Sequence, residues 1–468
     1  MTDLHVVILA AGKGTRMKSA LPKVLHPLAG RPLIEHILST VDHLPTTSTT
    51  LVVGHGADQV QTALASRPSL QYVVQSPQLG TGHALLQAEP VLSGATGNVL
   101  LLYADVPLLE PGTLLRLLEA HRNAKAAMTV LTAELPDPYG YGRIVRGGEG
   151  QIERIIEERD ASSAQRAIRE INSGIYALSM EPLFEHLHRL ATDNSQGEYY
   201  LTDLVGLYRQ QGLPVDALCL DSADELRGVN SRLDLAELSQ IVRQRKNRLL
   251  MMDGVTLDDP ATTFVDMDVT VGPDTVLGPG VRLEGRTVVG DRCRIHAGSR
   301  LTNVTMEDDV VVLDYSVIVD SRVGQGAAVG PMAHVRPESV IGSGARVGNF
   351  VELKKTSLGK GSKASHLTYL GDATIGEGVN IGAGTITCNY DGAAKYPTII
   401  EDGVFIGSDS QLVAPVTVGK DAYVGAGSTI VSDVPAGSLA LARGRQVIKA
   451  DWAAKRKAAR KATQKGGH

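Results

Sequence analysis

Residues 271–283 read VGPDTVLGPGVRL, and an aliphatic side chain returns in them at every sixth position. The same spacing continues in three runs that reach Ile430. Because residues two apart in a strand share one face, each six-residue repeat offers two inward side chains, an aliphatic anchor and a short residue two positions before it. The anchors are Val271, Leu277, Leu283, Val289, Ile295 and Leu301 in the first run, Val317, Val323, Val329, Val335, Ile341, Val347 and Leu353 in the second, and Ile400, Ile406, Leu412, Val418, Val424 and Ile430 in the third.

These repeats predict a parallel β-helix, in which short strands alternate with corners and stacked coils bury a core that no single repeat could build. Glycines such as Gly272, Gly278 and Gly290 follow the anchors. We expect the chain to turn there with a positive φ, which costs little only for glycine. The alternative, a series of ordinary β-hairpins with accidental spacing, does not explain three runs of repeats.

The six-residue phase is interrupted at three places. It slips near Leu358 and near Ile375, and it breaks between Thr387 and Thr398. We expect residues 388–397 to leave the coil as an insertion. Insertions in such repeats tend to gather on one face, which is often the functional one.

Length and composition limit the class of protein. A chain of 468 residues predicts two to three domains, and the net charge of −5 argues against a nucleic-acid-binding protein. Cys219, Cys293 and Cys388 lie far apart, which predicts reduced thiols without a metal cluster. We see no secretory signal and no apolar stretch near the ~18 residues that span a bilayer, so we expect a cytoplasmic protein without membrane insertion.

The end of the chain, residues 449–468, forms a basic tail. We interpret it as a solvated and frayed end, because chain termini are often poorly ordered. Its cations are Lys449, Lys455, Arg456, Lys457, Arg460, Lys461 and Lys465.

The first 230 residues alternate between strand and helix patterns. Continuous apolar runs are typical of strands that are buried on both faces of a parallel sheet, and helical periodicity between them predicts a doubly wound α/β domain. The expected strands cover 6–10, 50–53, 71–75, 98–103 and 128–131, and the helical patterns include 33–41 and 114–118.

A glycine-rich loop, Ala11-Gly12-Lys13-Gly14-Thr15-Arg16, follows the first strand. Backbone N–H groups in such a loop converge on phosphate oxygens, and Lys13 and Arg16 add charge. Lys23, in Leu21-Pro22-Lys23, is a further cation within reach of the same loop. Asp105 follows the strand 98–103, where open α/β sheets place ligands. A carboxylate there suits Mg²⁺, and a helix N-cap before Pro107 is the alternative.

Leu9-Ala10-Ala11-Gly12-Lys13-Gly14-Thr15-Arg16-Met17 with Pro22-Lys23 resembles the sugar-1-phosphate nucleotidyltransferases. With the hexad repeats behind it, nearly the whole chain is similar to the bacterial bifunctional N-acetylglucosamine-1-phosphate uridyltransferase/glucosamine-1-phosphate acetyltransferase family. Only the last twenty or so residues fall outside the resemblance. It implies a Rossmann-like uridyltransferase domain at 1–230, a linker helix at 231–251, a left-handed β-helix acetyltransferase domain at 252–448, and a homotrimer.

The resemblance also implies the reactions and the small-molecule substrates. Acetyl-CoA would acetylate glucosamine-1-phosphate, and UTP would then donate a uridylyl group to N-acetylglucosamine-1-phosphate with release of pyrophosphate and with Mg²⁺ as cofactor. Two rival readings remain. The β-helix could be only a regulatory or assembling domain of a nucleotidyltransferase, or the chain could resemble guanine-nucleotide exchange subunits that share both folds without the chemistry.

For uridyl transfer, the resemblance implies that Arg16 and Lys23 are catalytic and that Asp105 and Asn230 bind Mg²⁺. A side-chain amide at Gln75 and backbone amides at Gly80–Thr81 can pair with the edge of uracil. From the residues alone, Asn230 could equally be an N-cap, Glu157 a solvated charge and Gly80 a plain turn. Ala104 stands where the family has glycine, so its methyl group could crowd the nucleotide. The implied nucleotide and sugar site is Leu9, Ala10, Ala11, Gly12, Lys23, Gln75, Gly80, Thr81, Tyr103, Ala104, Asp105, Gly142, Glu157, Asn172 and Asn230.

For acetyl transfer, the stretch Lys363–Gly371 matches the family and implies that His366 is the general base. Without the resemblance, a lone histidine is more often structural. A cation pair with a histidine and a tyrosine near an insertion suits an anionic amino sugar. The implied sugar site is Arg336, Lys354, Tyr369, Asn380, Asn389 and Tyr390, and the implied acetyl-CoA site, between subunits, is Ala383, Ser408, Ala426 and Arg443.

Overall fold

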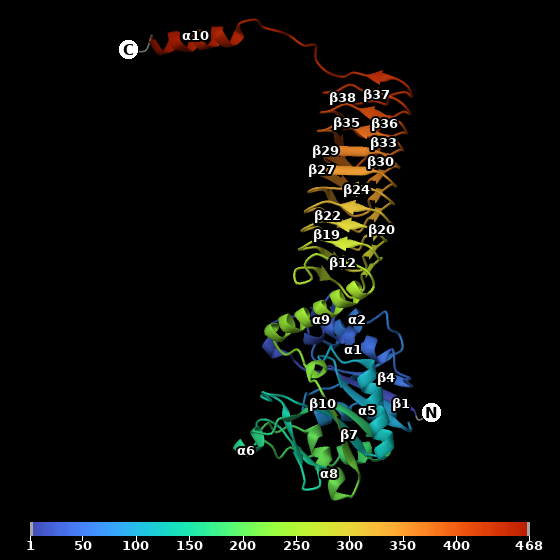
Figure 1. The fold of residues 1–468 in the computed structure, drawn as a ribbon, viewed down its shortest axis with the longest axis vertical. Coiled ribbons are helices and arrows are strands. Elements are labelled where there is room, and N and C mark those ends of the chain that lie inside the picture. The colour runs from blue at the N-terminus through green and yellow to red at the C-terminus, as the bar shows by residue number, and fades with distance from the viewer. Residues whose placement is uncertain (1–2, 466–468) are drawn as a thin grey trace. The chain divides into compact units, whose positions relative to one another are not determined.

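The computed structural model describes residues 3–465, which form two compact units divided between Lys246 and Asn247 (Figure 1). The division falls inside helix α9 (Arg232–Met252), which confirms the predicted long helix but not a separate linker. Asn247 is 1% exposed. Its side-chain amide donates hydrogen bonds to the carbonyl oxygens of Pro260 at 2.9 Å and Thr263 at 3.0 Å, so the end of α9 belongs to the second unit.

The first unit is built on a mixed sheet in the order β11-β7-β10-β6-β1-β4-β5. Its interior strand β1 is buried along its whole length, as its apolar sequence predicts. The strands are β1 (Leu4–Leu9), β4 (Ser48–Val53), β5 (Leu70–Val74), β6 (Asn98–Tyr103), β7 (Met128–Glu134), β10 (Glu170–Ser179) and β11 (Val215–Leu220), with the smaller β8 (Gly142–Arg146) and β9 (Ile152–Ile156) beside β10 and the pair β2 (Pro27–Leu28) and β3 (Arg31–Pro32).

Helices connect these strands, so the predicted alternation of strand and helix is confirmed. The sheet departs from the predicted parallel arrangement at β10, which runs antiparallel to β6, β7 and β8, and at β9, which runs antiparallel to β8. The helices are α1 (Leu33–Val41), α2 (Ala57–Ala63), α3 (Thr81–Leu86), α4 (Glu89–Leu92), α5 (Pro111–Ala124), α6 (Ser163–Arg166), α7 (Met180–Leu187) and α8 (Leu204–Gln210), with 3₁₀ turns at Thr15–Met17, Lys23–Leu25, Leu201–Asp203 and Asp224–Leu226.

The second unit is a left-handed parallel β-helix with three faces, followed by the tail helix α10 (Trp452–Lys465). The tail therefore forms a helix where we predicted a frayed end. Strands β27 (Arg346–Lys354) and β29 (Lys363–Gly371) run through faces 1 and 2 without interruption.

The other strands divide among the faces as follows. Face 1 holds β12 (Thr256–Leu257), β15 (Val276–Leu277), β18 (Arg294–Ile295), β21 (Val311–Val312), β24 (Ala328–Val329), β31 (Asn380–Ile381), β34 (Phe405–Ile406), β37 (Tyr423–Val424) and β39 (Leu439–Ala440). Face 2 holds β13 (Phe264–Val265), β16 (Arg282–Glu284), β19 (Arg300–Thr302), β22 (Val317–Val319), β25 (His334–Val335), β32 (Ile386–Cys388), β35 (Gln411–Val413) and β38 (Thr429–Ile430). Face 3 holds β14 (Thr270–Val271), β17 (Val288–Val289), β20 (Thr305–Met306), β23 (Arg322–Val323), β26 (Val340–Ile341), β28 (Ser357–Leu358), β30 (Ala373–Ile375), β33 (Thr398–Ile400) and β36 (Val416–Val418).

The predicted anchors form the core of this coil with one error. Val317 is only half-buried, and the inward residue is its neighbour Ile318. The core also continues through Met306 and Val312, which the six-residue spacing did not predict. The spacing between successive core residues shortens from six to five before Met306 and after Ile318, which shifts the phase of the repeat. The predicted slips near Leu358 and Ile375 shift it in the same way. The coil also begins at β12, earlier than the predicted start near residue 271.

The predicted role of the glycines was wrong at most positions. Gly272, Gly278 and Gly290 do not have positive φ. Glycine is needed there because the next coil passes very close. A Cβ atom on Gly290 would lie 2.5 Å from Oδ1 of Asp308 and 2.7 Å from the backbone of Glu307. Positive φ occurs further along each corner, often at aspartate or asparagine.

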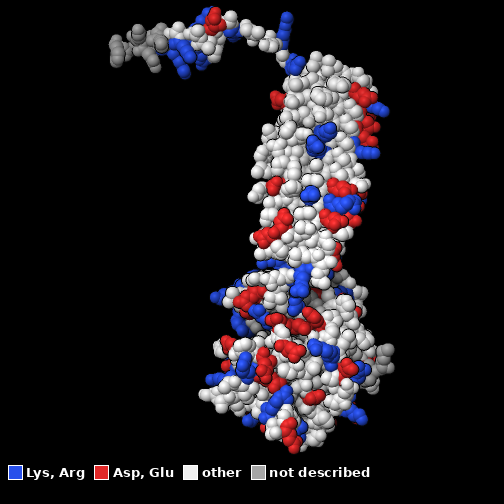
Figure 2. Space-filling model, viewed as in Figure 1, with Lys and Arg blue, Asp and Glu red and all other residues white. Residues whose placement is uncertain are grey.

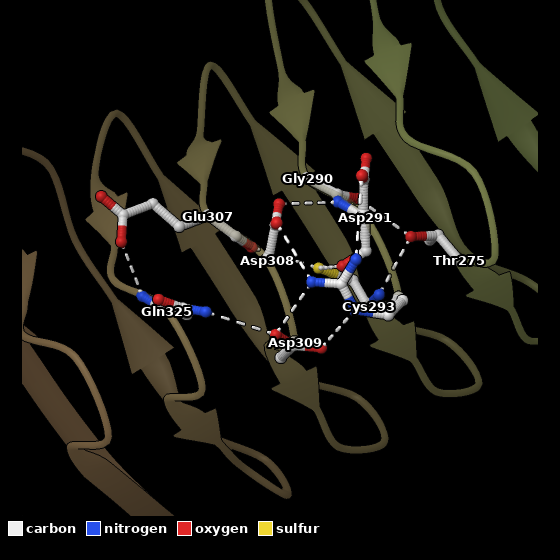
Figure 3. A network of polar contacts seen from close by, with 9 residues as sticks. Thr275, Gly290, Asp291, Cys293, Glu307, Asp308, Asp309 and Gln325 are labelled. Carbon is white, nitrogen blue, oxygen red and sulfur yellow. Dashed lines mark hydrogen bonds and ion pairs between the residues drawn. The ribbon is translucent and has the colours of Figure 1, made fainter.

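Short inward residues join the coils through hydrogen bonds (Figure 3). The Thr275 hydroxyl donates to the Gly290 carbonyl oxygen at 2.9 Å and accepts from the Cys293 amide at 3.0 Å. On the outside of the same corner, Oδ1 of Asp308 accepts from the Asp291 amide at 3.0 Å. A threonine or serine in the core therefore satisfies backbone groups that the corner leaves without strand partners.

Gly290→Ala should lower the free energy of unfolding by about 1–3 kcal/mol, because an added methyl group would overlap the backbone of the following coil. Gly326→Asn is the matched control. Gly326 has a φ of +65° and open space around it, and Asn303 adopts a φ of 53° at another corner of the β-helix, so asparagine should be tolerated. Urea denaturation of both variants tests this expectation, and equal losses of stability would contradict it.

Candidate functional site

A cavity of about 270 Å³ lies at the carboxyl ends of β1, β5 and β6 in the first unit. Ten of the predicted nucleotide-site residues line it, and they come from four separate parts of the chain. They are Leu9, Ala10, Ala11, Gly12, Lys23, Gln75, Gly80, Thr81, Tyr103 and Asp105. The structure adds four lining residues that were not predicted, namely Val24, Gln78, Ala84 and Glu198.

The glycine-rich loop is shaped to let Lys23 reach this cavity. Gly14 has a φ of +58°, and a Cβ atom there would lie 2.7 Å from Cβ of Lys23. Gly12 has nothing within 4 Å of its added Cβ position, so the backbone stays open to a ligand. Glycine at these two positions therefore serves different needs, close packing in one case and ligand access in the other.

Four polar side chains meet beside the loop. Lys23 forms an ion pair with Asp105, and its Nζ atom also lies 3.4 Å from Oδ1 of Asn230. Arg16 donates a hydrogen bond to the same Asn230 oxygen at 2.9 Å. Residues more than 200 positions apart thus place two cations against the side-chain oxygens of Asp105 and Asn230.

The N-cap alternatives for Asn230 and Asp105 do not hold in the structure. Asp234 accepts hydrogen bonds from the amides of Asn230 at 2.9 Å and Ser231 at 2.8 Å, and Ser231 Oγ accepts from the Asp234 amide at 3.3 Å. Ser231 and Asp234 therefore cap α9, and the Asn230 side chain is left for the site. Asp105 precedes α5, whose N-cap is Glu110.

The segment predicted to recognise a base is held rigidly. Gln75 is 4% exposed, and its Nε2 atom donates to the Gly80 carbonyl oxygen at 2.9 Å. Gly80 has a φ of +109°, and a side chain there would strike the backbone of Tyr199. Burial raises the pKa of Tyr103, with further contributions from Glu157 and Asp105, while a hydrogen bond with Thr81 acts in the opposite direction.

The predicted sugar residues lie deeper in the unit. Gly142 and Asn172 are register partners in β8 and β10, and Asn172 donates to the Tyr176 hydroxyl at 2.7 Å. Glu157 lines a neighbouring cavity of about 270 Å³, and burial raises the pKa of its carboxyl group despite a hydrogen bond from Thr202. Ala104 is fully buried in the core cluster, so its methyl group does not narrow the nucleotide cavity.

One corner of the β-helix collects the predicted acetyl-CoA residues. It lies between faces 1 and 2, and the segments stack there in successive coils. The Gly384 amide donates to the Leu367 carbonyl oxygen at 3.0 Å, directly after His366. On the following coils, the Asp409 amide donates to the Ala383 carbonyl oxygen at 2.7 Å, and the Gly427 amide donates to the Ser408 carbonyl oxygen at 2.8 Å. The Arg443 guanidinium donates to the Ala426 carbonyl oxygen at 2.8 Å.

His366 is exposed at this corner and is oriented by Asn349. Nδ1 of His366 lies 2.8 Å from Oδ1 of Asn349, its register partner on the preceding coil. Because a carbonyl oxygen can only accept, Nδ1 carries the proton in this contact and Nε2 is the basic nitrogen. No sequence pattern predicted the role of Asn349, since only the coil-to-coil register brings the two residues together.

A separate cationic group gathers around Asp372. Lys354 forms an ion pair with Asp372 at 2.8 Å, and Asn389 also donates to this carboxylate. Lys354 lowers the pKa of Lys395, which shows that the two ammonium groups are close. The predicted insertion brings Lys395 there, through an antiparallel bridge between Tyr390 and Lys395.

Arg336, Tyr369 and Asn380 are held in different ways. Arg336 lies on the coil before Lys354 and forms an ion pair with Glu352 at 2.9 Å. Its charge contributes to the lowered pKa of Lys395. Tyr369 lies in β29, near Lys354. Asp372 has the largest effect on the raised pKa of Lys354, and Tyr369 adds a smaller effect in the same direction. Asn380 lies on face 1, in register with Lys363, and none of the side-chain hydrogen bonds among the described residues joins it to the cationic group.

Comparisons with known proteins cover almost the whole chain. It is 49% identical over 452 residues to the bifunctional protein GlmU of Pelobacter propionicus, covering 97% of this chain and 98% of that protein. It is 51% identical over 451 residues to that of Trichlorobacter lovleyi, with 96% and 98% covered, and 47% identical over 455 residues to that of Shouchella clausii, with 97% and 100% covered. The chain belongs to the GlmU family.

Domain models agree with the two units. Residues 6–195 match the MobA-like NTP transferase domain, 261–351 match the GMPPB C-terminal domain and 397–432 match six bacterial transferase hexapeptide repeats. This GlmU-family chain is a bifunctional transferase with acetyltransferase and uridyltransferase activities. No helix in residues 3–465 is long and apolar enough to cross a membrane.

Asp372→Asn should lower stability at neutral pH and not at low pH. Burial raises the pKa of Asp372, but hydrogen bonds from Lys354 and Asn389 outweigh it and hold the pKa below its usual range. A depressed carboxyl pKa stabilises the fold above the unfolded-state value of about 3.9, and this contribution is lost as the pH falls through the folded-state value. We expect a loss of about 1 kcal/mol at pH 7.

Urea denaturation at pH 7 and near pH 3 measures the difference. Glu338→Gln is the control, because Glu338 pairs with Lys355 on the surface, where its side chain is 68% exposed. It should change stability little at either pH. An Asp372→Asn effect of the same size at both pH values would show that the ion pair does not matter.

Proposed function

We propose that this enzyme acetylates glucosamine-1-phosphate with acetyl-CoA on the β-helix and then transfers a uridylyl group from UTP to N-acetylglucosamine-1-phosphate in the first unit. The observation that carries the proposal is that each unit holds its own polar site. Lys23, Asp105 and Asn230 meet in the first unit, and His366 stands beside a cationic group in the second. We expect the cytoplasm as the location, since UTP and acetyl-CoA are cytoplasmic metabolites.

In uridyl transfer, an oxygen of the sugar phosphate attacks the α-phosphorus of UTP in line, and pyrophosphate leaves. The backbone at Ala11–Gly12 would cradle the phosphates, while Arg16 and Lys23 neutralise the charge that develops on them. No covalent protein intermediate is needed, because positioning and electrostatic stabilisation account for phosphoryl-transfer chemistry of this kind.

The oxygen donors fit Mg²⁺. Oδ2 of Asp105 and Oδ1 of Asn230 both approach Nζ of Lys23, so the two oxygens already face one cation. Mg²⁺ prefers oxygen ligands and usually takes only one or two from the protein, with the rest from water and substrate phosphates. When bound, it would supply charge neutralisation at the phosphate oxygens. Lys23 would then give up its contact with Asp105 and turn toward the nucleotide.

Asp105→Asn should reduce pyrophosphate release by at least about a hundredfold, because it removes the only carboxylate among the four meeting side chains. Thiol release from acetyl-CoA should continue near the wild-type rate, since that site lies in the other unit. Both assays are run on one preparation of the variant. Parallel loss of both activities in a folded variant would contradict two independent sites.

Base selection is assigned to the rigid segment at Gln75. Its amide and the Gly80–Thr81 backbone would meet the edge of uracil, and cytosine, with an exocyclic amine, reverses one donor–acceptor pair. A mismatched buried pair costs about 1–3 kcal/mol.

UTP should therefore be used roughly ten- to a hundredfold better than CTP. Gln75→Glu should narrow this ratio, because the changed carboxylate no longer donates to the Gly80 carbonyl oxygen. The measurement is kcat/KM for both nucleotides in the pyrophosphate-release assay. Equal rates for UTP and CTP in the wild type would remove Gln75 from base recognition.

In acetyl transfer, the sugar ammonium must lose a proton before it can attack. Nε2 of His366 would take this proton, while Asn349 holds the proton on Nδ1. The amine nitrogen then bonds to the thioester carbonyl carbon and the carbon–sulfur bond breaks. The second proton lost from the nitrogen goes to the sulfur, so that coenzyme A leaves as the thiol. Asn349 is a positioning residue, because it acts through His366.

The cationic group would hold the sugar phosphate. Lys354 and Lys395 are close, and such a pair is favoured when a dianion binds between them. Arg336 adds a planar fork that suits phosphate oxygens. We assign Tyr369 and Asn380 to the sugar as well. Asn389 and Tyr390, at the start of the insertion, would close over it.

Acetyl-CoA would lie along the corner from His366 toward Arg443, past Ala383, Ser408 and Ala426. A neighbouring subunit would complete this groove, as expected for a homotrimer. Exposed apolar side chains support the subunit contact. Four of them stand at this corner on successive coils, each on a residue with positive φ. At the other two corners, the residues with positive φ are glycine or polar residues. Such strain is tolerated when a contact repays it. The four are Tyr315, Met332, Phe350 and Leu367.

His366→Ala should lower thiol release by about 10²–10⁴-fold, the usual contribution of a general base, without changing uridyl transfer. Asn349→Ala should lower kcat with little change in KM and shift the pH profile of kcat, because the imidazole loses its fixed tautomer. Asn349→Asp should restore most of the rate. Thiol release within a few-fold of wild type for His366→Ala would show that His366 is structural.

A further inference from the structure

The two ends of the Gln75 side-chain amide have different surroundings. Its nitrogen, Nε2, donates to the Gly80 carbonyl oxygen at 2.9 Å and lies 3.2 Å from Nδ1 of His83. Its oxygen, Oε1, has no hydrogen-bond partner among residues 3–465 and is not sealed from solvent. Because Gln75 lines the nucleotide cavity, this oxygen is the end of the amide that is open to a ligand there.

His83 supplies the second acceptor for the Gln75 nitrogen. An amide nitrogen carries two hydrogens, and an unprotonated ring nitrogen can accept one of them. The contact therefore requires the tautomer of His83 that carries its proton on Nε2. The ring belongs to helix α3 and stacks on Tyr199, with 6.3 Å between the ring centres. The Gly82 amide also donates to the Tyr199 carbonyl oxygen at 2.9 Å, which holds this turn of α3 in place.

Gln87 competes for the same imidazole. Its Nε2 atom lies 3.2 Å from Nε2 of His83 and donates to the His83 carbonyl oxygen at 3.0 Å. A neutral imidazole accepts at only one nitrogen, so it can serve only one of the two glutamines as an acceptor. Gln75 is buried, whereas Gln87 is half-buried and already has the carbonyl oxygen. A buried donor loses more than an accessible one when it lacks an acceptor, so the Nδ1 lone pair is assigned to Gln75.

We propose that His83 determines the choice of base by fixing the orientation of the Gln75 amide. The inference rests on the proposed role of Gln75 in reading the base. With both Nε2 hydrogens directed at Gly80 and His83, only Oε1 can meet the base, and it can only accept. Uracil offers a donor at N3, whereas cytosine offers an acceptor that Oε1 repels. His83 is not one of the described residues that line the cavity, so it is a positioning residue that acts through Gln75.

Two substitutions separate the acceptor of His83 from its ring. His83→Phe keeps an aromatic ring beside Tyr199 and removes the acceptor. His83→Asn removes the ring and can place a carbonyl oxygen near the position of Nδ1. Figure 2 shows positive and negative side chains interspersed over the visible face of the first unit. Both replacements are uncharged, so they leave the electrostatic field that the anionic nucleotide meets unchanged.

The measurement is kcat/KM for UTP and for CTP, by pyrophosphate release from the full-length protein with N-acetylglucosamine-1-phosphate. In His83→Phe, Gly80 alone holds the amide, so the orientation with the nitrogen toward the base becomes more populated. We expect kcat/KM to rise for CTP and to fall for UTP, so that their ratio drops about three- to tenfold, the effect of one hydrogen bond. The kcat for UTP should stay near its wild-type value, because the contact with the base does not change during the reaction.

The other variants complete the test. His83→Asn should keep the wild-type ratio. Gln87→Ala is the matched control, because it removes the competing amide and should not lower the ratio. Thiol release from acetyl-CoA should be unchanged in every variant, since that site lies in the other unit. If His83→Phe does not fold, His83→Ala carries the same expectation.

The possible failures are distinguishable. Equal use of UTP and CTP by the wild type would remove Gln75 from base recognition and would end this inference with it. A wild-type preference for UTP that persists unchanged in His83→Phe would overturn the role of His83 alone. A parallel fall of kcat/KM for both nucleotides would show that His83 only supports the fold. An equal drop of the ratio in His83→Phe and His83→Asn would show that the ring matters and the acceptor does not.

Discussion

The backbone hydrogen bonds between successive coils determine the geometry of the second unit. The amide of Val276 donates to the carbonyl oxygen of Cys293, and the amide of Arg294 donates to that of Val310, each at 2.9 Å. Because the ladder is parallel, each coil must repeat the path of the one before it. Inward side chains then stack on like side chains, and the glycines at close approaches let the coils reach hydrogen-bonding distance. Outward side chains are placed with equal regularity, which makes the corners suitable positions for binding sites.

Both proposed active sites use a rigid scaffold and leave the chemistry to its edges. In the first unit the carboxyl ends of neighbouring strands bring the glycine-rich loop, Gln75 and Asp105 to one cavity. In the second unit a single corner aligns His366, Ala383, Ser408 and Ala426 along four coils. Departures from regularity have specific effects at these places. The antiparallel strand β10 carries Asn172, and the insertion after Thr387 carries Lys395 to Lys354.

Local patterns in the sequence predicted the elements well. The apolar runs predicted β1 and β6, the amphipathic pattern predicted α9, and the hexads predicted the β-helix together with the interruption at 388–397. The errors share a cause. Val317 and Ile318 are both aliphatic, so spacing alone could not tell which points inward once a five-residue step had shifted the phase. Likewise, glycine after an anchor looked like a turn residue, whereas the approach of the next coil explains it.

The fold class, the resemblance to a two-activity family and most residues that line the nucleotide cavity could be predicted from the sequence, because a loop motif and a repeat are short-range features. Which residues hold the others in place became known from the tertiary structure. Ser231 and Asp234 release Asn230 for the site by capping α9, Asn349 sets the tautomer of His366, and Asp372 holds Lys354. These partners lie on different turns or coils, and their contact depends on a register that accumulates over many residues. No local pattern records such a register, since it follows from the packing of the whole ladder.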